Sequence, residues 1–206
     1  MGRLADKNIL ITGGNSGIGL AAAQEFDREG ARVAICGLNE GSLQAAKETL
    51  GRGSLAVRAD VSNLTDLDTM FATVKREFGH LEGVFVNAGY SEFLLFEEVT
   101  EQSFDKVIAV NFKGAYFTIQ KALPLLRQGS YVIINASVGA RKGWPTTSTV
   151  STCKAAVVTS RSNPQRRTRG PRDSRKYPKP RPDGHGDVRS LPRRRAGRGG
   201  QGRPRN

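Results

Sequence analysis

A glycine-rich turn near the N-terminus constrains this chain more than any other feature. Residues 12–19 read Thr-Gly-Gly-Asn-Ser-Gly-Ile-Gly, between an apolar run at 8–12 and a helical pattern. Glycines let the backbone turn tightly, and a helix N-terminus offers free N–H groups and a positive dipole end. A strand, this turn and a helix together form the context of a dinucleotide-binding fingerprint. We therefore predict that the turn binds a pyrophosphate; an ordinary tight turn is the alternative.

Short apolar runs alternate with helical patterns along the first 160 residues. Strands are predicted at 8–12, 32–36, 54–60, 83–89 and 131–137, and helices at 17–30, 38–50, 64–79 and 101–127. A further helix is expected to start near Ser151 and to end before Pro164. Alternating strands and helices favour a parallel sheet covered on both faces. The sequence therefore predicts an α/β fold with a doubly wound parallel sheet of five strands.

Several motifs follow the turn in a fixed order, namely Asp60-Val61, Asn87-Ala88-Gly89, Asn111, Ser137 and Lys154. Together with the turn they resemble the short-chain dehydrogenase/reductase family over about residues 5–158. The resemblance implies a Rossmann-like fold and hydride transfer between NAD(P)(H) and a small alcohol or carbonyl substrate. It also implies that the aspartate contacts adenine and that the Asn-Ala-Gly motif stabilises the sheet beside the cofactor. The cofactor-binding residues it implies are Thr12, Gly13, Asn15, Ser16, Gly17, Ile18, Gly19, Leu38, Asp60, Val61, Asn87, Ala88, Gly89 and Lys154.

Some of these residues also have purely structural interpretations. Asp60 fits a turn or a helix N-cap, and Asn87 fits a residue that satisfies backbone groups at a strand end. Ser137 alone would be a hydroxyl at the end of a strand, and only its spacing to Lys154 indicates a site. The sequence leaves both interpretations open.

The chemistry implied by the resemblance needs four groups. A tyrosine acts as general acid or base, a lysine lowers the pKa of that tyrosine, a serine binds the substrate oxygen, and an asparagine supports a proton path. The last three roles fall to Lys154, Ser137 and Asn111. The tyrosine belongs four residues before the lysine, where this chain has Val150. Because valine cannot exchange a proton, we expect badly impaired hydride transfer even with cofactor bound.

The end of the second predicted strand bears on the choice of cofactor. An acidic residue there would favour NAD, whereas an arginine would favour NADP. Gly37 supplies no carboxylate, which favours NADP weakly. Leu38 stands where similar proteins of the family often have arginine, which points the other way. We expect NADP or NAD with a slight preference for NADP, and no metal.

Basic charge is concentrated in residues 161–206. The chain has 32 Lys and Arg against 19 Asp and Glu, and this segment holds 16 of the basic residues and three of the acidic ones. It also holds seven of the nine prolines and only four hydrophobic residues. Such a segment cannot bury enough apolar surface to offset the entropy of ordering. We therefore predict a domain of residues 1–160 and a disordered tail, which binds nucleic acid nonspecifically at most because it lacks aromatic stacking platforms.

The tail also departs from the family. In the family the lysine helix is followed by a sixth strand and a Pro-Gly loop. Suitable GC-rich codons for residues 171–188, read one base later, encode a run that begins Pro-Ala-Ile-Arg-Val-Asn-Thr-Leu-Ser-Pro-Gly-Pro and resembles those missing elements. We interpret the tail as the product of a reading-frame shift near residues 158–162, which leaves the domain C-terminally incomplete. The homo-oligomer typical of the family is therefore doubtful here.

Other observations exclude further classes of protein. No apolar run approaches membrane-spanning length, and the N-terminus lacks the apolar region of a signal peptide. Cys36 and Cys153 are far apart and are expected to be reduced thiols of a cytoplasmic protein. Two alternatives to an enzyme of this family remain, a non-catalytic dinucleotide-binding protein and a nucleic-acid-binding protein that uses the tail.

Overall fold

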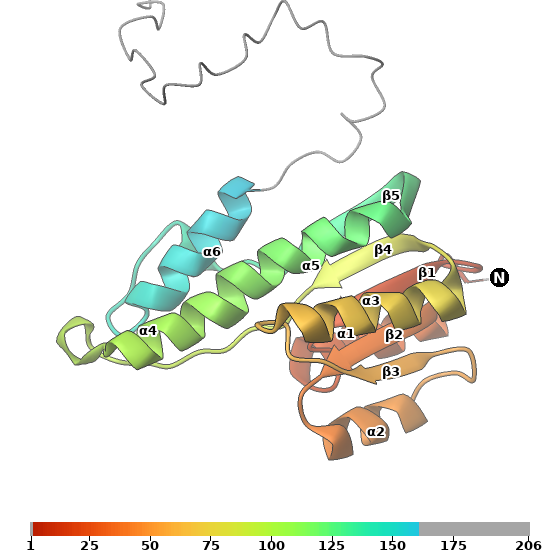
Figure 1. Cartoon of the computed structure of the whole chain (residues 1–206), viewed down its shortest axis with the longest axis horizontal. Coiled ribbons are helices and arrows are strands. Elements are labelled where there is room, and N and C mark those ends of the chain that lie inside the picture. The colour runs from red at the N-terminus through yellow and green to blue at the C-terminus, as the bar shows by residue number, and fades with distance from the viewer. Residues whose placement is uncertain (1, 161–206) are drawn as a thin grey trace, which may run out of the picture. The chain divides into compact units, whose positions relative to one another are not determined.

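The computed structural model describes residues 2–160, which form an α/β unit (Figure 1). The main elements are β1 (Asn8–Thr12), α1 (Gly17–Arg28), β2 (Arg32–Gly37), α2 (Glu40–Glu48), β3 (Leu55–Arg58), α3 (Leu64–Phe78), β4 (Leu81–Val86), α4 (Glu101–Ile108), α5 (Ala115–Ala122), β5 (Leu126–Ile134) and α6 (Ser148–Ser160). A π-helix, η2 (Ala109–Gly114), joins α4 to α5, and shorter helical turns lie at η1 (Phe96–Glu98), η3 (Leu123–Leu125) and η4 (Val138–Ala140). The predicted tail, 161–206, lies outside the described residues.

The five strands form one parallel sheet in the order β3-β2-β1-β4-β5. The predicted doubly wound α/β fold is therefore confirmed. Strand β1 lies in the middle, where Ile9 pairs with Val33 on one side and with Gly83 on the other. All five residues of β1 are buried, as expected for a central strand of a sheet covered on both faces.

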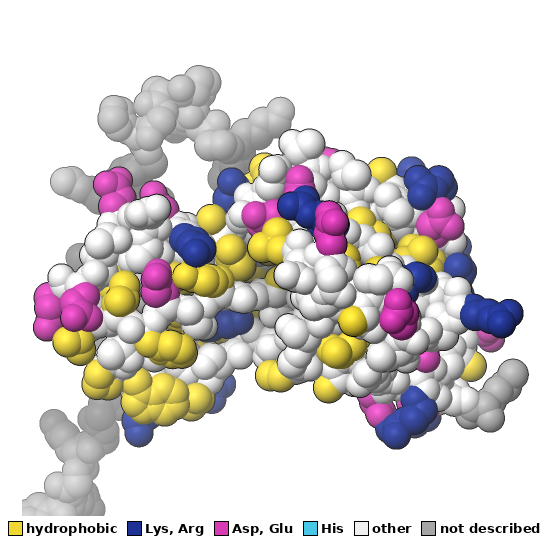
Figure 2. All heavy atoms as spheres, turned by 90° about the horizontal axis from the view of Figure 1, so that it is seen from below, with side chains coloured by type: hydrophobic (Ala, Val, Ile, Leu, Met, Phe, Trp, Pro, Cys, Tyr) yellow, Lys and Arg dark blue, Asp and Glu magenta, His cyan; other side chains and the backbone are white. Residues whose placement is uncertain are grey.

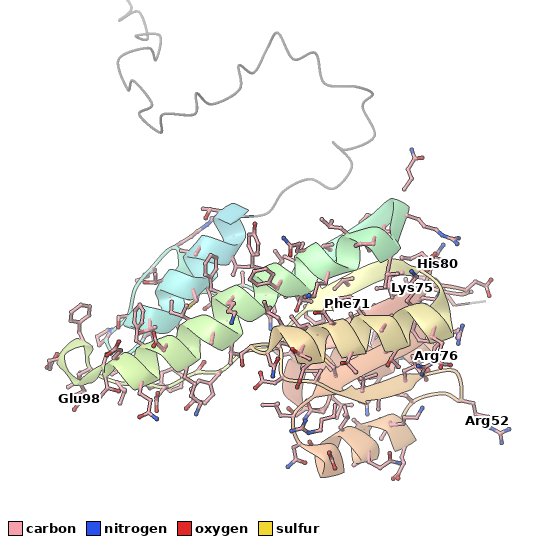
Figure 3. All side chains as sticks on the ribbon, in the orientation of Figure 1. Arg52, Phe71, Lys75, Arg76, His80 and Glu98 are labelled. Carbon is pink, nitrogen blue, oxygen red and sulfur yellow. The ribbon has the colours of Figure 1, made fainter. Side chains whose placement is uncertain are left out.

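Two hydrophobic clusters hold the helices on opposite faces of the sheet. Ala23 of α1 and Leu43 of α2 pack with Ile11 and Ile35 on one face. On the other face, Met70, Phe71 and Val74 of α3 are buried and pack with residues of α5 and α6. Arg76, near the end of α3, is exposed, and Arg52 in the loop before β3 extends outward (Figure 3). The helix periodicity that buries one stripe and exposes the other thus fixes the layers.

The predicted helix at 101–127 is wrong in two respects. It is interrupted by the π-helix η2, and it gives way to a 3₁₀ turn at Leu123–Leu125, followed by β5 from Leu126. Pro124 within that turn has no N–H to continue an α-helix. Strand β5 therefore begins five residues earlier than predicted, with a register irregularity opposite Leu81 to Gly83.

Three other predicted strand ends extend too far. Strand β3 ends at Arg58, β4 at Val86 and β5 at Ile134, so Asp60, Asn87 and Ser137 all follow their strands. Polar residues there lie beyond the carboxyl edge of the sheet, where ligands bind in folds of this kind. Within residues 2–160 no helix is both long and apolar enough to cross a membrane.

Candidate dinucleotide site

The glycine-rich turn is tied to the end of β4 by a buried hydroxyl. Thr12 Oγ1 accepts hydrogen bonds from the backbone N–H groups of Asn87 and Ala88, at 3.0 and 3.1 Å. Gly13 adopts a φ of +64°, and a Cβ there would lie 2.9 Å from Ala88 Cα. Only glycine combines this backbone conformation with so close an approach. The turn and β4 are therefore built as one unit.

The start of α1 faces the turn without a side-chain cap. Ser16 is the N-cap residue, but its hydroxyl makes no capping hydrogen bond. The first N–H groups of a helix have no partner within the helix, so they are available to an anion. Gly17 has a φ of +52°, and a Cβ there would meet nothing within 4 Å. A Cβ at Gly19 would lie 2.0 Å from the Gly13 carbonyl oxygen, so Gly19 lets helix and turn pack closely.

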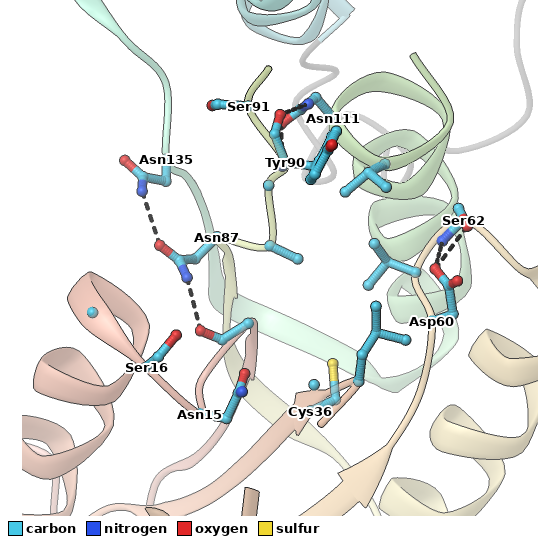
Figure 4. A pocket seen from close by; sticks show the side chains of 18 of the residues that line it. Asn15, Ser16, Cys36, Asp60, Ser62, Asn87, Tyr90, Ser91, Asn111 and Asn135 are labelled. Atoms are coloured by element: carbon cyan, nitrogen blue, oxygen red, sulfur yellow. Dashed lines mark hydrogen bonds between the residues drawn. The ribbon is translucent and has the colours of Figure 1, made fainter. Parts of the chain in front are cut away.

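A cavity of about 790 Å³ opens above this turn, at the carboxyl ends of the strands (Figure 4). The predicted residues that line it are Gly13, Asn15, Ser16, Gly17, Ile18, Leu38, Asp60, Val61, Asn87, Ala88, Gly89, Asn111 and Lys154. Thr12, Gly19 and Ser137 are not part of the lining. The first two support the turn from beneath, and the Ser137 hydroxyl instead accepts a hydrogen bond from Gly139 N, which caps η4.

Two asparagines connect the turn to α6. Asn87 Nδ2 donates to the carbonyl oxygens of Thr12 and Gly13, each at 3.1 Å, and Asn87 Oδ1 accepts from Asn135 Nδ2 at 2.8 Å (Figure 4). The Asn135 carbonyl in turn accepts from Lys154 Nζ at 2.7 Å. A continuous series of hydrogen bonds thus runs from the turn to the lysine. The structural interpretation of Asn87 holds, and the same side chain also faces the cavity.

Asn111 lies in the π-helix and is almost fully buried. Its Oδ1 accepts from Tyr90 N at 3.2 Å, and its Nδ2 donates to the carbonyls of Tyr90 and Val107. Local π-helices are often found at functional sites. Here the extra residue in the turn places Asn111 against the loop that follows β4.

Lys154 is half-buried, and burial lowers the pKa of its ammonium. Val150 lies four residues earlier on α6, one helical turn away, and is partly buried. The neighbouring Ser151 Oγ lies 3.1 Å from Thr147 Oγ1. Residues 148–160 include no tyrosine, so Lys154 has no phenol on its own helix.

Asp60 stabilises a turn and also lies at the cavity. Its Oδ1 accepts from the backbone N–H and the hydroxyl of Ser62, at 2.8 and 2.7 Å. The N-cap of α3 is Asn63 rather than Asp60. Of the two structural interpretations of Asp60, the turn is thus correct and the N-cap is not. Asp60 nevertheless remains one of the residues that line the cavity.

The cavity also contains residues that the sequence interpretation missed, above all Tyr90, Lys106, Asn135 and Cys36. Lys106 Nζ lies 4.1 Å from the centroid of the Tyr90 ring, and the Tyr90 hydroxyl raises the pKa of Lys106. Burial raises the pKa of Cys36 to about 12, so this thiol stays protonated. Asn135 was detectable as the first polar residue after a run of apolar ones, whereas Lys106 gave no signal.

Comparison with known proteins agrees with this architecture. Residues 7–165 match the family model of short chain dehydrogenases. The chain is 42% identical over 157 residues to oxidoreductase asL5 of Sarocladium schorii, a match that covers 75% of this chain and 63% of that protein. It is 38% identical over 138 residues to L-fucose dehydrogenase of Rattus norvegicus, covering 66% and 51%. The chain thus spans about half to two thirds of these relatives.

Solved structures are similar over the same part of the chain. The crystal structure of levodione reductase matches with a TM-score of 0.72 and 31% identity, covering 76% of this chain and 64% of that one. The structure of 3-ketoacyl-(acyl-carrier-protein) reductase from Brucella melitensis, complexed with NADH, matches with a TM-score of 0.73 and 29% identity, covering 76% and 67%.

Proposed function

Because this chain belongs to the short-chain dehydrogenase family, we propose that its cavity binds NAD(H) or NADP(H) while the chain itself transfers hydride very slowly. The observation that supports this most directly is that the glycine-rich turn and Lys154 border one cavity, while Val150 lies one helical turn before the lysine. By family, the substrate would be a small alcohol or carbonyl compound.

The residues present fit a dinucleotide. The cavity of about 790 Å³ lies within the usual range for small-molecule sites, about 300–1,000 Å³. A Cβ at Gly13 would collide with Ala88 and a Cβ at Gly19 with the Gly13 carbonyl oxygen, whereas a Cβ at Gly17 would meet nothing within 4 Å. The turn and the start of α1 would hold the phosphates, Asp60 the adenine end, and Lys154 the ribose. When bound, the nicotinamide ring supplies hydride chemistry.

The proposed loss of turnover follows from proton transfer. A carbonyl that gains a hydride must also gain a proton on its oxygen, and a phenol with a lowered pKa provides it in the family. Lys154 is still held in place by the Asn135 carbonyl. The isopropyl group of Val150 has no proton to give. Loss of a positioned general acid typically lowers the rate by about 10²–10⁴.

We propose a slight preference for NADP over NAD. NAD recognition at the end of β2 needs an acidic side chain. A Cβ at Gly37 would lie 2.3 Å from Asn15 Oδ1, so a longer side chain could not enter without moving Asn15. Asn15 itself is held by a hydrogen bond from its Nδ2 to Ser42 Oγ, at 2.8 Å.

A second candidate function is non-catalytic dinucleotide binding in which Val150 is selected rather than accidental. The two candidates differ in origin. If a reading-frame shift produced residues 161–206, the nucleotide sequence around codons 148–165 would contain an inserted or deleted base relative to intact relatives. A continuous frame there would favour the second candidate.

Two further proposals concern surroundings rather than chemistry. We propose that the basic segment 161–206 binds nucleic acid nonspecifically, because it contains 16 Lys and Arg and only three Asp. Added salt should weaken this binding. We also propose a cytoplasmic location. The support for the latter is that Cys36 and Cys153 are both free and buried.

Calorimetric titration and a turnover assay test the central proposal together. Folded protein titrated with millimolar NADPH and NADH should release or absorb heat and should melt at a higher temperature. The same preparation should oxidise NADPH negligibly with a panel of ketones and aldehydes. Absence of heat and of a melting shift would refute the binding proposal, and rapid oxidation would refute the proposed loss of turnover.

A further inference from the structure

A second cavity, of about 520 Å³, lies on the face of the sheet that carries α1. It shares no lining residue with the dinucleotide cavity, and we call it the sheet-face cavity. Alternate residues of neighbouring strands form its floor, because alternate side chains of a strand point to the same face. In the register of the sheet, Gly83 of β4 lies between Ile9 of β1 and Tyr131 of β5. The volume is within the usual range for small-molecule sites, about 300–1,000 Å³.

Helix α1 covers only one side of the sheet-face cavity. Phe26 of α1 and Phe85 of β4 pack against the buried cluster that includes Ile9. Tyr131 and Ile133 of β5 also line the cavity, but they are 71% and 54% exposed. The cavity is therefore an apolar hollow that is closed on the side of α1 and open above β5.

The hollow owes its depth to the missing side chain at position 83. A Cβ on Gly83 would lie 3.5 Å from the Ile9 side chain, which is an ordinary van der Waals contact. Gly83 is also not among the residues with a positive φ. Neither the backbone nor the packing thus requires glycine here, and a larger residue could occupy part of the space that Gly83 leaves free.

Two cationic residues border the hollow at the amino ends of the strands. Lys7 precedes β1 and Arg127 is the second residue of β5; both are exposed, and neither forms an ion pair with any residue from 2 to 160. Glu82 lines the cavity too, but its two oxygens contact His80 Nε2 at 2.7 Å and the Asn8 N–H at 2.8 Å. The unpaired charge beside the apolar floor is therefore positive. In the view of Figure 2, by contrast, acidic and basic side chains both lie among the hydrophobic ones.

Two macromolecular occupants fit this combination poorly. Residues 161–206 contain 16 Lys and Arg and only four hydrophobic residues, so they match neither the apolar floor nor the cations. A two-fold dimer uses the same patch of both copies. Such a dimer through this face would bring Lys7 and Arg127 of both copies to one interface, where like charges repel.

We propose that the sheet-face cavity binds an amphipathic anion, a molecule with one carboxylate on a hydrocarbon chain of medium length. The hydrocarbon would lie on Gly83 between Phe85 and Tyr131, where its burial is favourable in proportion to the apolar area removed from water. The carboxylate would lie near Lys7 and Arg127, since a guanidinium binds a carboxylate through two N–H groups. This site is separate from the proposed cofactor site and does not depend on it.

Decanoate is the test ligand, and decyltrimethylammonium, which carries the same hydrocarbon chain on a cation, is its control. Both are titrated into the ¹⁵N-labelled 206-residue chain at low ionic strength, and the amide NMR shifts are followed. Affinities are taken from amides of β4 and β5, because the basic segment 161–206 also attracts anions. Decanoate should shift the amides around Gly83 and should bind about tenfold more tightly than the ammonium compound, as expected for one charge-assisted contact.

Three variants separate the two parts of the site. Gly83→Val fills the floor and should weaken decanoate binding at least about tenfold. The double variant Lys7→Gln, Arg127→Gln should lose the preference for the carboxylate over the ammonium head. Lys75→Gln is the matched control, because Lys75 is exposed on α3, on the opposite face of the sheet, and should change neither result.

Equal affinity for the two head groups in the unsubstituted chain would overturn the proposal, and so would decanoate binding that Gly83→Val leaves unchanged. If Gly83→Val does not fold, the double variant still decides, because both of its altered side chains are exposed. A dimer that forms in the unsubstituted chain and disappears in Gly83→Val would assign this face to a second copy instead. NADPH binding should be the same in Gly83→Val, so failure of the cofactor proposal would leave this result intact.

Discussion

The two sides of the dinucleotide cavity differ in how completely they are built. On the side of β1, β2 and β4, the turn is held by Thr12 and Asn87, and glycines fill the positions where the backbone comes close. On the side of β5 and α6, Lys154 and Asn111 are in place, but the helical turn before the lysine carries Val150. Different residues are thus needed to bind a dinucleotide and to transfer a proton. A chain can lose the group that transfers the proton and still keep the residues that bind the dinucleotide.

The largest expected effect concerns the α6 side. Replacing Val150 by tyrosine should restore little turnover, because the substrate-binding loop that follows the sixth strand in the family has no counterpart within residues 2–160. Activity of the unsubstituted chain should already be about 10²–10⁴ below that of an intact relative. NADPH oxidation with a panel of carbonyl compounds measures the activity of the variant and of the unsubstituted chain. Val150→Phe is the control, since it adds the ring without the hydroxyl. Full activity of Val150→Tyr would mean that α6 lacks nothing but the phenol.

The complementary change on the turn side should abolish cofactor binding without touching α6. A valine at Gly19 would place its Cβ 2.0 Å from the Gly13 carbonyl oxygen and 2.6 Å from Asn87 Nδ2. The turn must then shift, and overpacking of this kind costs about 1–3 kcal/mol of folding stability. Calorimetry should detect no NADPH binding, and the melting temperature should fall. Gly143→Ala, at a position with nothing within 4 Å of the added Cβ, should change neither.

A third test concerns the sheet edge on the β5 side. Tyr131 and Ile133 of β5 are 71% and 54% exposed, and β5 pairs only with β4 within the described part of the chain. An exposed apolar edge strand favours aggregation. A chain in which the proposed reading-frame shift is reversed after residue 160 should therefore melt several degrees higher, as followed by circular dichroism, and should scatter less light on heating. Equal melting temperatures would contradict a structural deficit on this side.

Breaking the hydrogen-bond series between the two sides should have a smaller but measurable effect. Asn135→Ala removes the donor to Asn87 Oδ1 and leaves that oxygen without its 2.8 Å partner. An unsatisfied, partly buried acceptor costs about 1–3 kcal/mol, so the melting temperature should fall by a few degrees. NADPH affinity should fall only a few-fold, because Lys154 bonds to the Asn135 backbone rather than to its side chain. Ser91→Ala, on the cavity wall but without a hydrogen bond to this series, is the control.

The smallest effect lies far from both sides. The side chain of Arg3 donates to Glu29 Oε1 at 2.8 Å, and this contact lowers the pKa of Glu29 to about 2. A carboxylate with a lowered folded-state pKa stabilises the fold above its unfolded pKa, near 4.5, and loses that contribution as pH falls toward 2. Thermal melts between pH 5 and pH 2 should show a slightly steeper loss of stability than in Arg3→Ala. Parallel curves would mean that the exposed pair contributes nothing.

The sequence predicted the turn side of the cavity better than the α6 side. At Gly13 and Gly19 the spacing of glycines, strand and helix is dictated by close backbone approach, so the pattern is local and can be recognised in the sequence. The parallel, doubly wound sheet of five strands followed from the alternation of predicted strands and helices. On the other side, the start of β5 depends on tertiary pairing with Leu81, and the hydroxyl of Ser137 caps η4 rather than lining the cavity.

Some residues left no trace in the sequence because their roles arise only in three dimensions. Lys106 reaches the cavity by lying over the Tyr90 ring, a contact between residues 16 positions apart. The widening of the helix at Asn111 was equally invisible, since its residues have ordinary helical preferences.

That widening limits how this chain can change by insertion or deletion. Each residue of an α-helix advances the direction of the side chains by about 100°. A π-helical residue advances it by less, so the six residues of η2 turn about as far as five residues of an α-helix. Deleting one residue from η2 would therefore give an uninterrupted helix with α4 and α5 in nearly the same relative rotation, but the widened turn that holds Asn111 would be lost. Asn111 could then no longer reach both Tyr90 and Val107 while Ala115 and Ala122 stayed in the core. The extra residue therefore fixes the length of this segment, and descendants of the chain would tolerate substitutions there far better than a change in residue number.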